Sequence, residues 1–383
     1  MTAEKLRTLA TIASLAALCL LQSCGNSTGV RLSGSFSIVG RGAVLDRFSS
    51  DLWVHGNAAY TGTWELRASA GNQLFGNVLN VWDISDPANP QRTSSLTIDA
   101  RTINDVKISS DGTLGLITHE GSNDGLNGVT LIDLTNPLQP SVISRTTTSL
   151  EPGVHNAWLE GNYAYLVVDG SSASSGLRVL DISDPANPQV AASFYGGSSF
   201  LHDVYVRDGF AFLSHWDAGL IILDVGNGVA GGSPTNPVEV GRVQTAGGQT
   251  HNAWYWPAAG YVFVGEEDFA TPGIMHVVDV SDMANPREVA TFAVPGTTPH
   301  NFWMDEAREI LYVAWYGNGI RALDVSGELT GALDQQGREI TGFLYAQGSG
   351  AEFPEQTWAP QLHNGLLYLS DLQTGLWVLR PDF

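Results

Sequence analysis

Five histidines recur along this chain of 383 residues, each at the head of a similar short segment. They are His155, His202, His251, His300 and His363. Four of them are followed directly by Asn, and His202 is followed by Asp203. Neutral imidazole is a common ligand of zinc, copper, iron and nickel. Three or four such ligands with one open coordination position would let a bound metal activate water or oxygen.

The same recurrence also has a structural interpretation, because a residue that returns once in every repeat can serve the repeat itself. Two weaker copies of the segment carry Ser50 and Asn104 where the others carry His. The repeat therefore does not strictly need histidine, which favours a metal or ligand site. A His that forms hydrogen bonds only within its own repeat remains the alternative.

Each histidine opens a unit of short segments that are typical of β-strands. In the clearest unit the segments are 156–159, 163–168, 177–182 and 189–194. They are rich in branched and aromatic residues and are separated by Gly, Asn, Asp and Pro. No stretch beyond residue 30 shows a helical period. The sequence therefore predicts an all-β protein.

The unit starts at residues 51, 105, 156, 203, 252, 301 and 364. Intervals of roughly 50 residues are typical of the four-stranded blades of a β-propeller. The third strand and its turn repeat most plainly, as Val-Leu-Asp-Ile-Ser-Asp-Pro-Ala-Asn-Pro at 179–188 and close variants at 81–90 and 277–286. We interpret this acidic motif as a turn, in which Asp and Asn bond the backbone. The pattern resembles the LVIVD-repeat family of β-propellers, which is defined by its repeat and not by one activity.

The two ends of the repeat region complement each other. The last unit has three predicted strands, whereas a spare strand at 32–39 precedes the first unit. We expect this N-terminal segment to supply the outer strand of the last blade and to close the ring. Residues 31–383 are thus predicted to form a single seven-bladed β-propeller.

Strand order decides which side chains share a face of such a propeller. The turn before strand one and the turn between strands two and three lie on the same face, so the histidines should meet acidic and aromatic residues there. These include Glu120, Asp169, Glu267, Tyr316 and Asp371. A long segment at 346–362 could form a partial lid over this face. Trp158, Trp254 and Trp303 are expected to pack between blades.

The first residues resemble a bacterial lipoprotein signal. Lys5 and Arg7 precede an apolar run at 10–21, which is followed by Cys24. The run is too short for a comfortable membrane span. The resemblance implies removal of residues 1–23, a lipid on Cys24, a tether at 24–30 and the membrane as a partner. Gly25 would direct sorting to the outer membrane in a double-membraned bacterium. An ordinary secretory signal with an incidental Cys is the alternative.

Charge and cysteine content exclude several classes. The chain has 39 acidic and 18 basic residues, for a formal net charge of −21. Such a surface repels phosphate backbones, so nucleic acid is not expected as a partner. Cys19 and Cys24 are the only cysteines, which leaves no disulfide framework or Cys-based zinc site in the repeats.

These patterns define two functional hypotheses. The first is a lipid-anchored extracytoplasmic protein that binds an unknown protein or small molecule through its His-bearing face. The second is a metal-dependent enzyme, most readily an oxidoreductase, that holds copper, iron or zinc with the histidine cluster.

Overall fold

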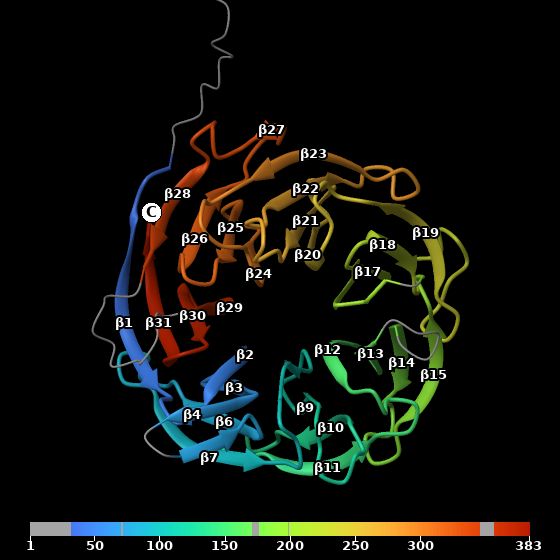
Figure 1. Ribbon diagram of the computed structural model, residues 1–383, viewed down its shortest axis with the longest axis vertical. Helices are drawn as coiled ribbons and strands as arrows, with labels where there is room; N and C mark the ends of the chain where they lie inside the picture. The colour runs from blue at the N-terminus through green and yellow to red at the C-terminus, as the bar shows by residue number, and fades with distance from the viewer. Residues whose placement is uncertain (1–31, 70–71, 171–175, 198, 345–355) are drawn as a thin grey trace, which may run out of the picture. The chain divides into compact units, whose positions relative to one another are not determined.

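Short strands separated by Gly, Asp and Asn turns build a ring of seven blades (Figure 1). The computed structural model describes residues 32–69, 72–170, 176–197, 199–344 and 356–383. Residues 33–383 form one unit, and no helix occurs among the residues described in it. The predicted all-β, seven-bladed β-propeller is confirmed.

Each blade is an antiparallel sheet whose innermost strand lies nearest the axis. Blade 1 comprises β2 (Phe48–His55), β3 (Ala58–Trp64), β6 (Val78–Asp83) and β7 (Gln91–Thr97). Blade 2 comprises β8 (Val106–Ile108), β9 (Leu114–His119), β10 (Gly128–Asp133) and β11 (Ser141–Thr146). Blade 3 comprises β12 (Val154–Glu160), β13 (Tyr163–Val168), β14 (Gly176–Asp181) and β15 (Gln189–Phe194). Blade 4 comprises β16 (Asp203–Arg207), β17 (Phe210–His215), β18 (Gly219–Asp224) and β19 (Val238–Val243).

The remaining blades follow the same order with additions. Blade 5 comprises β20 (Thr250–Trp256), β21 (Tyr261–Glu266), β22 (Met275–Asp279) and β23 (Arg287–Phe292), joined by the parallel strand β27 (Gly331–Ala332). Blade 6 comprises β24 (Phe302–Asp305), β25 (Ile310–Ala314), β26 (Ile320–Asp324) and β28 (Glu339–Phe343). Blade 7 comprises β29 (Thr357–His363), β30 (Leu366–Asp371), β31 (Gly375–Asp382) and β1 (Ser35–Ala43). A small hairpin of β4 (Leu66–Ser69) and β5 (Asn72–Phe75) extends from blade 1.

Apolar burial lies between neighbouring blades. One cluster joins Val167 and Val179 of blade 3 to Val204 and Leu213 of blade 4. Middle strands are buried on both faces, as in β14, whereas outer strands such as β15 are largely exposed. Each blade therefore buries its faces only against its two neighbours, as in other repeat architectures.

The N-terminal strand closes the ring, as predicted. β1 pairs with β31 from Ser35 opposite Asp382 to Ala43 opposite Gly375, and the two ribbons lie side by side in Figure 1. β1 is therefore the outer strand of blade 7, and it joins the first strand of the unit to the last.

The repeated acidic motif forms turns. The carboxylates of Asp83, Asp181 and Asp279 each accept the backbone N–H two residues later, at 2.9 Å in all three cases. This local bond pins the link between the third and fourth strands and confirms the turn interpretation.

The predicted start of blade 7 is wrong. Its innermost strand is Thr357–His363, so His363 ends this strand and does not precede it. The Thr357 end of the strand had been assigned to a lid. Pro360 hides the strand in the sequence, yet β29 is the edge of its sheet, where a missing N–H is tolerated.

Several predictions concern residues outside the described part of the chain. The signal at 1–23, the tether at 24–30, the lipidation of Cys24 and the lid segment up to residue 355 all fall there. Among the residues that the structure does describe, no helix is long and apolar enough to cross a membrane.

Candidate functional site at the histidine-bearing mouth

A bulge at the start of the innermost strands turns the histidines toward the axis. In β12, Val154 pairs with Val168 and Asn156 with Val167, so His155 is the extra residue. In β20, His251 is the extra residue in the same way. A bulge interrupts the alternation of a strand and re-aims a side chain. Histidine and the following Asn can therefore both line the channel.

Four of the predicted histidines meet at one mouth of the channel. The ring centroids of His155 and His202 are 4.5 Å apart, those of His202 and His251 4.1 Å, and those of His251 and His300 4.4 Å. All four line a cavity of about 290 Å³. The prediction that these histidines gather on one rim is therefore confirmed for blades 3 to 6.

The fifth histidine does not join them. His363 lies at the opposite end of its strand, is half-buried, and its Nε2 is 2.8 Å from the carbonyl oxygen of Gly56. The bulge position in blade 7 is held by Trp358, whose ring centroid is 4.3 Å from that of His300. Trp64 lies next to both Trp358 and His155 and so completes the rim where no histidine is present. Its ring centroid is 5.2 Å from that of Trp358 and 6.1 Å from that of His155.

Backbone carbonyls fix the orientation of two of the imidazoles. Nδ1 of His202 is 2.9 Å from the carbonyl oxygen of His251, and Nδ1 of His300 is 2.7 Å from that of Trp358. A carbonyl can only accept, so Nδ1 carries the proton and donates in both cases. In the neutral ring Nε2 then keeps its lone pair, which is the arrangement found in oriented metal ligands.

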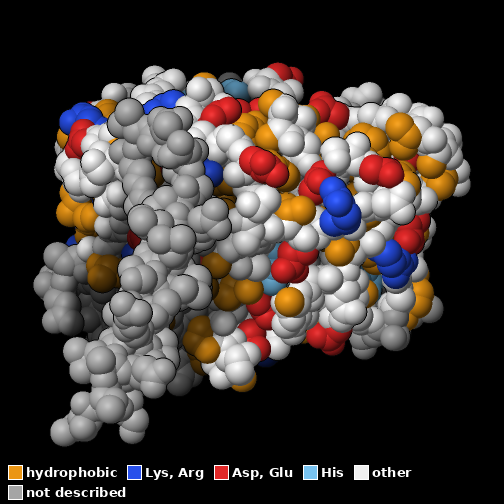
Figure 2. Space-filling model, turned by 90° about the horizontal axis from the view of Figure 1, so that it is seen from above, with side chains coloured by type: hydrophobic (Ala, Val, Ile, Leu, Met, Phe, Trp, Pro, Cys, Tyr) orange, Lys and Arg blue, Asp and Glu red, His pale blue; other side chains and the backbone are white. Residues whose placement is uncertain are grey.

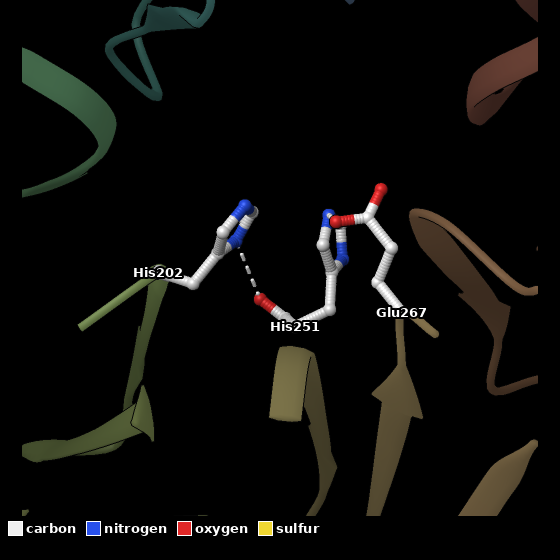
Figure 3. Close-up of side chains that lie close together, drawn as sticks. All are labelled: His202, His251 and Glu267. Atoms are coloured by element: carbon white, nitrogen blue, oxygen red, sulfur yellow. Dashed lines mark hydrogen bonds and ion pairs between the residues drawn. The ribbon is translucent and has the colours of Figure 1, made fainter. Parts of the chain in front are cut away.

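The closest set of ligand atoms joins blades 4 and 5. One ligand atom each of His202, His251 and Glu267 lies within 4.8 Å of the other two (Figure 3). Nε2 of His251 is 3.8 Å from Oε2 of Glu267, whose other oxygen accepts a hydrogen bond from the hydroxyl of Tyr316. Nδ1 of His251 is buried and has no hydrogen-bond partner among the described residues.

Burial keeps these imidazoles neutral. It lowers the pKa of His202 and of His300 well below the usual value, and the neighbouring histidines add to the effect. Burial also lowers the pKa of His251, although the charge of Glu267 acts in the other direction. At neutral pH all three rings therefore offer lone pairs and not protons.

A second group of ligand type lies beside the first. Glu120, His155 and Asp169 also have ligand atoms within 4.8 Å of one another, and Nδ1 of His155 is 3.2 Å from Oε1 of Glu120. Burial and the charge of Glu120 raise the pKa of Asp169 to about 7. Burial acts to lower the pKa of His155, but Glu120 outweighs it and the pKa is raised. This group differs from the first because the pKa of its histidine is raised and not lowered.

A buried ion cluster forms the floor of the mouth. The Nζ of Lys107 is 2.9 Å from Oδ2 of Asp51 and also contacts Oδ1 of Asp105. Burial acts to raise the pKa of Asp51, but Lys107 outweighs it and the pKa is lowered. Burial raises the pKa of Asp105 well above its usual value, so the cluster holds one ammonium and one ionised carboxylate. The sequence placed both Asp residues at repeat starts but gave no sign of this ion pair.

The tryptophans predicted to pack between blades line the channel below that floor. Trp158, Trp254 and Trp303 occupy the same register in successive blades, and all three are half-buried. Their rings contact aromatic neighbours around the axis, as with Trp254 and Trp303 at 5.1 Å. The three side chains also pack against the apolar clusters between neighbouring blades, so the predicted packing between blades is found.

The strand order expected from the sequence predicted most of the residues that line the mouth. Glu120, Asp169, Glu267 and Tyr316 were predicted to share the histidine face, and the structure brings each of them to a rim histidine. Trp358 was missed because its segment lacks the His-Asn pair. Its rim position follows from the pairing of β29 with β30, in which Trp358 is the extra residue between Thr357 and Ala359.

The fold and the mouth define a seven-bladed β-propeller with an imidazole-lined opening. The sequence model of the LVIVD repeat matches residues 74–97, 153–195 and 201–245, which lie in blades 1, 3 and 4. The chain is thus a β-propeller that carries LVIVD repeats, and the resemblance seen in the sequence is confirmed. No curated protein matches the chain.

Proposed function

We propose that the protein binds a transition-metal ion at the histidine-bearing mouth, with His202, His251 and Glu267 as ligands. The observation that carries the proposal is the approach of their three ligand atoms to within 4.8 Å inside a largely buried site. The hydrogen bond from Nδ1 of His202 to the carbonyl of His251 supports it, because Nε2 of that ring then keeps its lone pair for a metal.

The donor set indicates which metals fit. Two imidazoles and one carboxylate are a ligand set used for iron in oxygenases and for zinc in hydrolases, and copper also favours imidazole. Donor atoms that share one metal lie roughly 3 Å apart, so binding would draw the three side chains together. His300 stands next to His251 and could supply a further nitrogen.

Metal analysis of the purified protein tests this proposal. We expect one equivalent of copper, iron or zinc after loading and removal of excess metal. His251→Gln and Glu267→Gln should each raise the Kd for the metal by at least about 100-fold, because loss of a ligand exceeds loss of a second-shell contact.

The chain offers a matched control in His363→Gln. His363 is a half-buried histidine of the same predicted series but lies at the opposite end of its strand from the rim position. Its substitution should leave the metal content unchanged. If the wild type rejects all three metals while circular dichroism shows an intact β fold, the proposal is wrong.

A catalytic role is a second candidate, because the cavity of about 290 Å³ leaves room for a substrate beside the metal. The class would be an oxidoreductase if the metal is copper or iron. Oxygen consumption with small reductants, by metal-loaded wild type but not by His251→Gln, would support it. Equal rates for the two proteins would remove it.

We also propose that Cys24 anchors the protein in the cell envelope, at the outer membrane in a double-membraned host. The support is the order of charges, apolar run and Cys in residues 1–24. Labelling with palmitate in a bacterial host should mark the wild type and not Cys24→Ser. A labelled Cys24→Ser protein would contradict the anchor.

A further inference from the structure

A closed ring of five aromatic side chains surrounds the axial channel below the floor of the mouth. Its members are Trp53, Trp158, Tyr205, Trp254 and Trp303, from blades 1, 3, 4, 5 and 6. Around the ring, consecutive centroids are 5.9, 4.5, 4.9, 5.1 and 6.4 Å apart. Lys107 and Gln361 occupy the corresponding positions in blades 2 and 7.

The size of this ring suits a cation. In a regular five-membered ring of these spacings, the centre lies on the order of 4.5 Å from each centroid, which is within the range for cation–π attraction. The ring borders a cavity of about 60 Å³. One water needs roughly 10–15 Å³ of such space, so several waters or one compact organic group can fit.

The charges at the cavity wall favour the same kind of ligand. The wall includes Asp51, Asp203 and Lys107. The ammonium of Lys107 is paired with Asp51, which leaves the carboxylate of Asp203 as the excess charge. Among the described residues, none forms an ion pair with Asp203, whose Oδ1 accepts only the N–H of Val204, at 2.6 Å.

The protein already places one cation against this wall. The Nζ of Lys107 lies 5.5 Å from the ring centroid of Trp53. An ammonium is thus accepted at one side of the ring, while among the described residues no Lys or Arg lies over the faces of Trp158, Trp254 or Trp303. A carboxylate ligand would meet Asp203 and is disfavoured.

We propose that the aromatic ring is a binding site for a small organic cation of the quaternary ammonium type, separate from the metal site. Five aromatic rings supply cation–π attraction, Asp203 supplies the opposite charge, and the cavity sets the size limit. The alternative is that the aromatic ring only fills the channel and binds no ligand, and the experiment must distinguish this from a cation-binding site.

Calorimetric titration of the full-length protein with choline tests the proposal, with 3,3-dimethylbutan-1-ol as the uncharged compound of the same shape. Choline should bind at least about tenfold more tightly than the neutral compound, because only the cation gains from the rings. A chelator in all samples keeps the result independent of the metal site.

Two variants locate the binding. Asp203→Asn keeps the size of the side chain and should weaken choline binding several-fold while leaving the neutral compound unaffected. Trp254→Phe should weaken choline in the same way, and His363→Gln should behave as the wild type. Equal affinities for choline and the neutral compound, or no choline binding at millimolar concentration by the folded wild type, overturn the proposal. Neither result would decide the metal proposal, because that proposal is tested on His251 and Glu267 and not on Asp203 or the aromatic ring.

Discussion

Two buried histidines outside the mouth, His119 and His276, show how the neighbouring charges decide whether burial lowers the pKa of an imidazole. His119 is fully buried, and neither ring nitrogen has a hydrogen-bond partner among the described residues. Burial lowers its pKa to about 4. His276 is equally buried but lies between Glu266 and Glu288, with nitrogen–oxygen distances of 3.4 and 3.2 Å. Burial acts to lower the pKa of His276, but the two carboxylates outweigh it and raise the pKa.

His119 should make the fold sensitive to acid. Its folded-state pKa lies below the unfolded value of about 6.5, so the unfolded chain takes up a proton first and stability falls as pH drops from 6.5 toward 4. The difference corresponds to at most about 3 kcal/mol. His119→Leu loses no hydrogen bond, and we expect a smaller loss of stability between pH 7 and pH 4.5 in urea unfolding.

His363, which is only half-buried, again provides the comparison. His363→Gln should lose as much stability on acidification as the wild type. A parallel decline for wild type and His119→Leu would show that the buried ring is not the group that takes up the proton.

The bulged first strand is the element that makes the mouth. Without the extra residue, His and Asn would alternate and point to opposite faces of the blade. Runs of branched and aromatic residues between Gly, Asn, Asp and Pro clusters located the strands in the sequence, because such residues favour strands and the clusters favour turns. The composition of these runs could not show the bulge, because a bulge shifts the pairing of the strand by one residue and does not change which residues the strand contains.

Blade 7 illustrates the same limit in another form. The sequence placed its first strand at His363-Asn364 because that pair copies the rim motif, but here the pair ends the strand. The strands, their hairpins and the closing N-terminal strand could be predicted from local patterns in the sequence. The rim position of Trp358 depended on pairing with β30, which only the three-dimensional register shows.

The closing strand β1 should carry a large share of stability. Phe36 is 9% exposed and packs on Tyr312 and Phe383, with centroids 6.3 and 5.5 Å away, whereas Ile38 is 51% exposed. Phe36→Ala should cost about 3 kcal/mol, and Ile38→Ala less than about 1 kcal/mol. Deletion of residues 33–43 should lower Tm by roughly 10 °C, since several backbone hydrogen bonds are also lost.

Scanning calorimetry of Phe36→Ala, Ile38→Ala and the deletion variant tests whether β1 is a closing strand or a loose tail. If deletion leaves the unfolding transition unchanged, β1 does not close the ring in solution.

At the scale of the whole propeller, the channel has two ends of different chemistry. Neutral imidazoles and Glu267 form one end, and aromatic rings form the other. Between them, the cluster of Asp51, Asp105 and Lys107 ties blade 1 to blade 2 at the axis. The acidic composition was plain from the sequence, and acidic side chains outnumber basic ones on the face in Figure 2. Lys107, the one lysine beyond residue 5, was not recognised as the internal counter-ion.

Lys107→Met should destabilise the fold by about 3–5 kcal/mol, because it leaves a buried carboxylate without its partner. Chemical unfolding measures the effect. The double variant Asp51→Asn/Lys107→Met should recover part of the loss, since both charges are then gone. A double variant less stable than Lys107→Met would contradict the ion-pair account.

Closure by β1 also sets an order of events during synthesis. β1 is the first strand of the propeller to leave the ribosome, but its partner β31 is the last strand to be made. Blades 1 to 6 can form from neighbouring segments while β1 waits without a partner. The ring can therefore close only after β31 has been synthesised, and a nascent chain that stalls within blade 7 would expose an unpaired strand edge.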